Sequence, residues 1–182
     1  MKEKVIESQI VFQGRLLKVE VDKVELENGV ISTREVVVHR GAVAILPILY
    51  SGDIVLVRQF RLPANKVLLE IPAGTLSPGE EPLECAKREL EEETGYRAGK
   101  WNKLVSLFLA PGYSTECIHI FCAEELTMGE KHADEDEVIS SEIVPFSKAL
   151  EMVFNNEIED AKTACAILFY NALKERRDDY GL

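Results

Sequence analysis

Residues 88–93 read RELEEE, which places four carboxylates within six positions. In a helix with 100° per residue, Glu89, Glu92 and Glu93 share one face, because residues three and four apart are neighbours. Three carboxylates on one face repel each other unless a cation lies among them. Their hard oxygens suit Mg²⁺ or Mn²⁺. The spacing therefore raises the hypothesis of a divalent metal site.

Periodicity alone leaves two interpretations of this helix open. Leu83, Ala86 and Leu90 form an apolar stripe beside the three glutamates, so the carboxylates border a buried edge. A bound cation would remove the repulsion at that edge. A charged face that is simply solvated is common on helices and needs no ligand. Glu84 and Glu91 point away from the three glutamates and are predicted to be surface charges.

The residues around the cluster favour the cation. From Gly74 the chain reads GTLSPGEEPLECAKRELEEETGY, which resembles the Nudix box. That pattern is Gly, five residues, Glu, seven residues, Arg-Glu, an aliphatic, any residue, Glu-Glu, any residue, Gly and an aliphatic. The matching residues are Gly74, Glu80, Arg88, Glu89, Leu90, Glu92, Glu93 and Gly95. Tyr96 departs from the final aliphatic, which leaves the expected ligands untouched.

This resemblance implies a hydrolase that uses divalent cations to cleave a nucleoside diphosphate linked to another group. The positions that match the family's metal ligands are Glu89, Glu92, Glu93 and the backbone carbonyl of Ala73. Within the box, the resemblance makes Glu92, Glu93 and Arg88 catalytic candidates. It also implies that Arg88 and Glu80 brace the loop against the helix. A plain ion pair of Arg88 with Glu84 or Glu92, four residues away, is the alternative.

Segments outside the box resemble the ADP-ribose pyrophosphatase branch of the family. LLEIPAG leads into the box, APGYSTE places Pro111 sixteen residues after Gly95, and GEKHADEDEVI resembles an acidic loop before the last strand. The implied reaction is hydrolysis of ADP-ribose to AMP and ribose 5-phosphate with Mg²⁺, or Mn²⁺ in its place. Another nucleoside diphosphate sugar, a dinucleoside polyphosphate, or a nucleotide-binding sensor without catalysis are the alternatives.

The acidic loop supplies the candidates for the catalytic base, which must take a proton from the attacking water. The resemblance places Glu135 as the base and Glu137 as an additional metal ligand. Asp134 and Asp136 remain open, because a shift of one residue in the alignment exchanges the roles. A solvated loop without a catalytic role is the alternative. The histidines match no base in the pattern: His39, His119 and His132.

Residues for substrate binding follow from the same resemblance. Arg61, then Arg58, in VRQFR are expected to bind the phosphates; the alternative is that they cover the strand surface. Arg34 and Glu35 are expected to reach the adenine or ribose, across a dimer interface. Ser114, Thr115 and Glu116 are expected to line the ribose side of the pocket.

The elements that must position these residues alternate between strands and helices. Asn28-Gly29 indicates a hairpin turn, and Ser51-Gly52-Asp53 another. A helix is predicted over 82–94 with Gly95 as its C-terminal stop, and two more begin near Ser147 and Asp160. The predicted fold is α/β (α+β): a Nudix-like α/β/α sandwich with a mixed sheet in residues 41–182, plus a small antiparallel β-meander in residues 1–40.

Composition narrows the class of partner. The 182 residues carry a formal net charge of −11, which disfavours binding to nucleic acid backbones. No run approaches the roughly 18–20 apolar residues of a membrane span. The four cysteines form no C-x-x-C pair, which is typical of a reduced cytoplasmic protein. The thin N-terminal sheet cannot bury much by itself, and the resemblance implies a homodimer.

Overall fold

The structure, a computed structural model, describes the backbone of residues 2–129 and 138–180 and the side chains up to residue 176. The chain divides into two compact units. The first contains Met1–Gly41 together with Leu107–Ile118, and the second contains Ala42–Ser106 and His119–Leu182. Among the described residues, no helix is both long and apolar enough to span a membrane.

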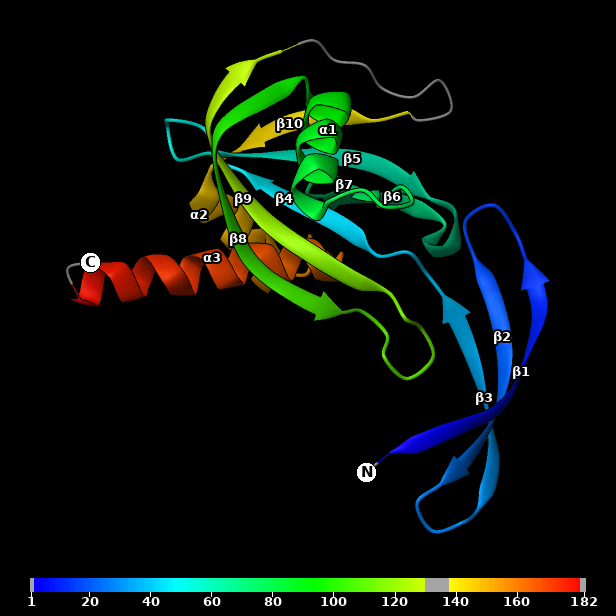
Figure 1. Cartoon of the computed structure of the whole chain (residues 1–182). Coiled ribbons are helices and arrows are strands. Elements are labelled where there is room, and N and C mark those ends of the chain that lie inside the picture. The colour runs from blue at the N-terminus through cyan, green and yellow to red at the C-terminus, as the bar shows by residue number, and fades with distance from the viewer. Residues whose placement is uncertain (1, 130–137, 181–182) are drawn as a thin grey trace. The chain divides into compact units, whose positions relative to one another are not determined.

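The first unit is built on an antiparallel sheet in the order β1-β2-β3, formed by Glu3–Gln13, Lys18–Leu26 and Ile31–Val38 (Figure 1). The predicted hairpin at Asn28-Gly29 joins β2 to β3, and Gly29 adopts a φ of 79°, which suits glycine. Val37 exchanges backbone hydrogen bonds with residues 113 and 115, which forms an isolated bridge between β3 and the segment 107–118 of the same unit. β1 is exposed along its whole length.

The second unit holds two sheets. One has the order β10-β5-β6, and the other has the order β7-β4-β9-β8, with the tips of β8 and β9 reaching into the first unit. The bounds are β4 Ala42–Pro47, β5 Ile54–Arg61, β6 Lys66–Glu70, β7 Ala73–Thr75, β8 Tyr96–Phe108, β9 Cys117–Met128 and β10 Ser140–Val144. A short 3₁₀ helix, η1 (Leu62–Ala64), joins β5 to β6.

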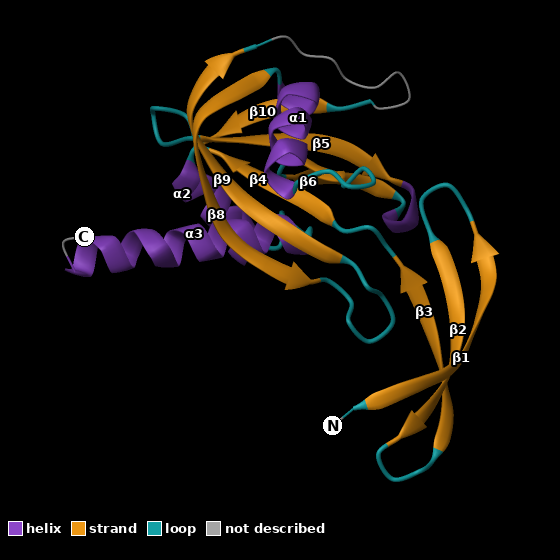
Figure 2. Ribbon diagram, in the orientation of Figure 1, coloured by secondary structure: helices purple, strands orange, loops and turns teal. Residues whose placement is uncertain are grey.

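Helices cover the strands of the second unit on both faces (Figure 2). They are α1 (Pro82–Thr94), α2 (Phe146–Phe154) and α3 (Ala161–Tyr180). All six residues of β4 are buried, which is the pattern of a strand packed on both sides. Val43 and Ile45 join the cluster that includes Leu90 of α1, and α3 packs against β4 as well.

The predicted fold class, an α/β/α sandwich with an N-terminal antiparallel meander, is confirmed. The predicted helix over 82–94 is confirmed at both ends. The helix α3 begins at Ala161, directly after Asp160. Oδ2 of Asp160 accepts the backbone N–H of Thr163 at 3.0 Å, so Asp160 is the N-cap of α3 as predicted. The acidic-loop residues Glu135 and Glu137, with Asp134 and Asp136, lie outside the described residues.

Candidate active site

The helix α1 is fixed at both ends by local sequence. Pro82 occupies the first turn, where its missing N–H costs no hydrogen bond. Gly95 ends the helix in the left-handed conformation with a φ of 76°, and its N–H donates to the carbonyl of Glu91 at 2.8 Å. These stops set the rotation of α1, and therefore decide which side chains face the sheet.

The apolar stripe of α1 packs as the periodicity predicts. Cys85, Ala86 and Leu90 are fully buried. Glu93, at 4% exposure, lies at the border of that stripe, and the side chain of Glu89 is 13% exposed. Glu93 and Glu89 therefore stand at the buried edge of the second unit, whereas the side chain of Glu92 is 33% exposed.

The two glutamates on the far side behave differently from each other. The side chain of Glu84 is 64% exposed and pairs with Lys87, as expected for a surface charge. The prediction that Glu91 is a surface charge is wrong. Its side chain is only 22% exposed, because Arg97 of β8 covers it and donates to Oε1 from Nε at 2.7 Å.

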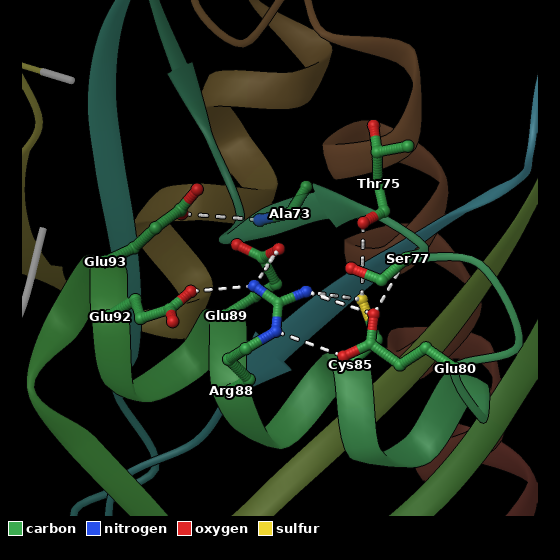
Figure 3. A network of polar contacts seen from close by, with 9 residues as sticks. All are labelled: Ala73, Thr75, Ser77, Glu80, Cys85, Arg88, Glu89, Glu92 and Glu93. Carbon is green, nitrogen blue, oxygen red and sulfur yellow. Dashed lines mark hydrogen bonds and ion pairs between the residues drawn. The ribbon is translucent and has the colours of Figure 1, made fainter. Parts of the chain in front are cut away.

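Arg88 lies at the centre of the polar network in Figure 3. Its Nη1 donates to Oε1 of Glu89 at 2.7 Å and to Oε2 of Glu92 at 2.8 Å. Its Nε and Nη2 donate to the two carboxylate oxygens of Glu80 at 3.1 and 3.2 Å. Arg88 thus joins the loop before α1 to the carboxylates of α1, and its contact with Glu92 is the ion pair four residues away that the sequence offered as the alternative.

Glu80 is held on both sides. It accepts from Arg88 and from the backbone N–H of Ser77 at 2.8 Å, and these contacts lower the pKa of Glu80 from 4.5 to about 2. Next to it, burial raises the pKa of the Cys85 thiol to about 12. Glu80 is therefore ionised and links the loop before α1 to Arg88. Cys85 is a neutral thiol that packs in the core.

The segment before the box is fixed against α1. The backbone N–H of Ala73 donates to Oε2 of Glu93 at 3.3 Å, and the carbonyl of Pro72 accepts from Ile45 of β4 at 2.8 Å. At Gly74 a built Cβ would lie 1.9 Å from the carboxyl carbon of Glu89. Only glycine leaves room for that carboxylate, so Gly74 and Glu89 are matched by close approach.

The donor set suits a hard divalent cation. Glu89, Glu92 and Glu93 bring carboxylate oxygens to one edge of α1, beside the backbone of Ala73. Within residues 2–129 and 138–176, no three His, Cys, Asp or Glu side chains are close enough together to enclose an ion. In this geometry Nη1 of Arg88 occupies the space between two of them. A metal ion held by Glu89 and Glu92 would have to compete with that guanidinium.

The two arginines expected to bind phosphates are both ion-paired. Arg61 donates from Nε and Nη2 to Glu70, both at 2.8 Å, and its side chain is 37% exposed. Arg58 donates to Glu142 of β10 at 2.8 and 3.1 Å and is more exposed. Arg61 also lies within the electrostatic influence of Glu93, so it belongs to the surroundings of the box.

The expected adenine and ribose residues belong to the first unit. Arg34 pairs with Glu3 of β1 at 2.7 Å, and Glu35 is exposed on β3. Thr115 accepts the backbone N–H of His39 at 2.9 Å, and Glu116 lies 3.9 Å from the ring of that histidine. The box residues belong to the second unit.

Sequence reasoning missed Glu70, which is 1% exposed, and its second partner Lys162. A lone carboxylate in the apolar stretch KVLLEIPAG was an available signal, because a charge there must be paired if the strand is buried. No local pattern could have named Lys162, which lies 92 residues away.

Two protein-family models match successive parts of this chain. Residues 38–165 match the NUDIX domain, and residues 3–37 match the nucleoside diphosphate sugar hydrolase N-terminal domain. The chain belongs to the NUDIX domain family and is a Nudix hydrolase by sequence and fold. Members of this family generally need a divalent metal ion.

Several relatives cover almost the whole chain. An ADP-ribose pyrophosphatase from Bacillus subtilis (strain 168) is 46% identical over 177 residues, covering 96% of this chain and 95% of the relative. A methanol dehydrogenase activator from Bacillus methanolicus is 42% identical over 170 residues, with 92% of each chain covered. A crystal structure of an ADP compounds hydrolase aligns with a TM-score of 0.86 at 26% identity, covering 97% of this chain and 96% of that chain.

Proposed function

We propose that this protein hydrolyses the pyrophosphate bond of ADP-ribose to AMP and ribose 5-phosphate in a reaction that depends on Mg²⁺, with Mn²⁺ as a substitute. The observation that carries the proposal is the row of three α1 carboxylates beside Ala73 and Gly74. The match of residues 3–37 to the nucleoside diphosphate sugar hydrolase N-terminal domain supports the substrate class. Within that class, the similarity to the ADP-ribose pyrophosphatase of B. subtilis supports ADP-ribose as the substrate.

In this proposal, Glu89, Glu92, Glu93, Glu137 and the carbonyl of Ala73 hold the metal. Bound Mg²⁺ would neutralise the pyrophosphate and lower the pKa of the attacking water. Glu135 accepts the proton as the water oxygen forms its bond to one phosphorus, and the bridging P–O bond breaks. Arg61 and Arg58 offset the remaining phosphate charge, while Arg34, Glu35, Thr115 and Glu116 contact the rest of the nucleotide.

The roles of the residues on α1 follow from their contacts. Arg88 holds Glu89 and Glu92 in place and ties them to Glu80, and a metal ion bound by Glu89 and Glu92 would replace the contacts of its Nη1. The N–H of Ala73 fixes the orientation of Glu93. Replacing Glu135 by Gln removes the proposed base and is expected to lower kcat by more than about tenfold. A smaller loss would move the role of base to another carboxylate of the acidic loop.

The substrate is tested by comparing kcat/KM for ADP-ribose, GDP-mannose and a dinucleoside polyphosphate under identical Mg²⁺. The highest value is expected for ADP-ribose. A higher value for another compound would keep the chemistry and reassign the substrate. A nucleotide-binding sensor without catalysis is the alternative from another class of protein. It is included in the test because one relative is named as a methanol dehydrogenase activator.

The Glu92→Gln variant separates an enzyme from a sensor. An enzyme is expected to lose orders of magnitude in rate, whereas a sensor would change mainly in nucleotide affinity. Glu84→Gln is the matched control on the same helix, because Glu84 is exposed and its side chain pairs with Lys87 at the surface. A control that loses as much rate as Glu92→Gln would show that any loss of charge on α1 disables the protein.

We also propose that the protein is a cytoplasmic homodimer. All four cysteines are free, which suits a reducing compartment. The first unit exposes large apolar side chains that a second copy can cover. They include Val5, Ile6, Ile10, Val11, Phe12, Ile31, Phe108 and Tyr113. Sedimentation of the wild type is expected to give twice the chain mass, and Phe12→Glu is expected to shift it toward the monomer. A monomeric wild type would contradict this.

A further inference from the structure

Glu70, the last residue of β6, is a buried carboxylate between two cations. Arg61 of β5 donates to Oε1 and Oε2 through two parallel hydrogen bonds of 2.8 Å. Lys162, in the first turn of α3, donates to Oε2 and also lies 3.0 Å from Oδ1 of Asp160. Burial raises the pKa of Glu70, but the two cations outweigh it and leave that pKa below its usual value. The carboxylate is therefore ionised and held at both oxygens.

Exposure differs sharply across this cluster. The side chains of Glu70 and Lys162 are 1% and 12% exposed, whereas that of Arg61 is 37% exposed. Only Nε and Nη2 of the guanidinium take part in the hydrogen bonds to Glu70, and within the described part of the chain Nη1 is left for another acceptor. Arg61 also experiences the charge of Glu93, the carboxylate that binds the N–H of Ala73. Arg61 is thus close enough to the box to feel the charge of one of its carboxylates.

A buried ion pair is weak support for stability, because desolvation of the charges offsets their attraction. A planar guanidinium fixed along one edge is instead a pre-oriented group for a phosphate, which it can bind through its other N–H groups. Fixing the side chain beforehand also lowers the entropy lost when the ligand binds. Glu70 and Lys162 are therefore better explained as groups that orient the guanidinium of Arg61 than as an ion pair that only stabilises the fold.

We propose that Glu70 is a positioning residue that holds Arg61 toward the substrate pyrophosphate, with Lys162 fixing Glu70 from α3. The proposal rests on the proposed function, in which Arg61 binds phosphate. Glu70 acts through Arg61 and does not touch the reacting atoms.

The start of α3 also fixes the chain immediately after Glu70. Oγ1 of Thr163 accepts the backbone N–H of Ile71 at 2.8 Å, and its own hydroxyl donates to Asp160. Thr163 is fully buried. The carboxylate of Glu70 and the backbone that leads to Ala73 are therefore held by one helical turn, so α3 positions two parts of the site together.

The experiment is a double-mutant cycle with Glu70→Gln, Arg61→Met and the double variant in the full-length protein. Glutamine keeps the shape of the side chain but removes the charge that orients Arg61. With ADP-ribose and Mg²⁺, Glu70→Gln is expected to raise KM by about tenfold or more and to change kcat less. In the Arg61→Met background the same change is expected to have almost no further effect, because the residue it positions is absent.

Glu159→Gln is the matched control. Glu159 pairs with Lys66 of β6 just before α3, so it joins the same two parts of the chain, but both side chains are well exposed. KM is expected to stay within about twofold of the wild type. A second readout needs no substrate: the Nε–H signal of Arg61 in an ¹⁵N-arginine NMR spectrum is expected to exchange slowly in the wild type and in Glu159→Gln, and rapidly in Glu70→Gln.

The outcomes distinguish failure of the proposed function from failure of the positioning role of Glu70. A folded wild type that hydrolyses no nucleoside diphosphate compound overturns the proposed function, and this inference with it. An active wild type in which the losses of Glu70→Gln and Arg61→Met multiply overturns the positioning role alone. So does a slowly exchanging Arg61 signal in Glu70→Gln, because Arg61 would then be oriented without Glu70.

Discussion

Replacing Gly74 by alanine is expected to remove most of the activity and leave the fold intact. The new Cβ would lie 1.9 Å from the carboxyl carbon and Oε1 of Glu89. Since ordinary contact begins near 3.5 Å, the carboxyl group must retreat by about 1.6 Å. A misplacement of about 1 Å at a reacting centre can cost about 100-fold in rate, so kcat/KM is expected to fall at least that far.

The same geometry predicts a small change in the free energy of unfolding of Gly74→Ala. The obstructing atoms are the far end of a flexible side chain, and Gly74 has no left-handed backbone that alanine would strain. The loss of a hydrogen bond between Arg88 and Glu89 costs about 1.5–3 kcal/mol, and alanine returns about 0.4–1 kcal/mol by restricting the unfolded chain. The net loss is expected to be about 0.5–2.6 kcal/mol, measured by urea unfolding.

Gly112→Ala is the control for this prediction, because a Cβ there meets nothing within 4 Å and the backbone is unstrained. Its activity and stability are expected to match those of the wild type. A folded Gly74→Ala variant with activity within about tenfold of the wild type would refute the argument that Gly74 makes room for a functional Glu89. An unfolded variant would refute the claim that only the end of Glu89 is in the way.

Three further predictions concern metal, pH and the start of α3. Mg²⁺ at 100 times its Kd is expected to stabilise the protein by about 2.7 kcal/mol in thermal unfolding, and a Glu92→Gln, Glu93→Gln variant should show almost no shift. Because the folded-state pKa of Glu80 is depressed to about 2, its contribution to stability is present above about pH 4.5 and is lost as pH falls toward 2. Glu80→Gln should flatten that part of the unfolding profile; an unchanged slope would remove Glu80 as its cause. Thr163→Val leaves the buried N–H of Ile71 without its acceptor and is expected to cost about 1–3 kcal/mol, whereas Thr163→Ser should retain stability. Equal stability of these two variants would show that the hydroxyl is unimportant.

Local sequence predicted the elements that depend on local rules. The helix over 82–94 was predictable because Gly95 must adopt a positive φ and because Leu90 recurs at helical spacing with Ala86. The position of the three glutamates beside that stripe was predictable from the same helical periodicity of 100° per residue. The exposure of Glu91 was not predictable, because it depends on Arg97 in the next strand.

Tertiary contacts explain what the sequence left out. The partners of Arg61 come from the end of β6 and from the first turn of α3, and no spacing rule connects segments so far apart. The closeness of Gly74 to Glu89 is likewise set by how β7 lies against α1. Motifs can thus predict which residue types do chemistry, while the groups that orient them are fixed by packing.

The central claim is that the carboxylates of α1 support hydrolysis of ADP-ribose. Its most direct measurement is product analysis after incubating the full-length protein with ADP-ribose and Mg²⁺, alongside a folded Glu92→Gln, Glu93→Gln variant. The wild type is expected to release AMP and ribose 5-phosphate in equal amounts, to stop on chelation of the metal, and to exceed the variant by orders of magnitude. Absence of AMP from folded wild-type protein across physiological pH and Mg²⁺ concentrations, or equal rates in the two proteins, would contradict it.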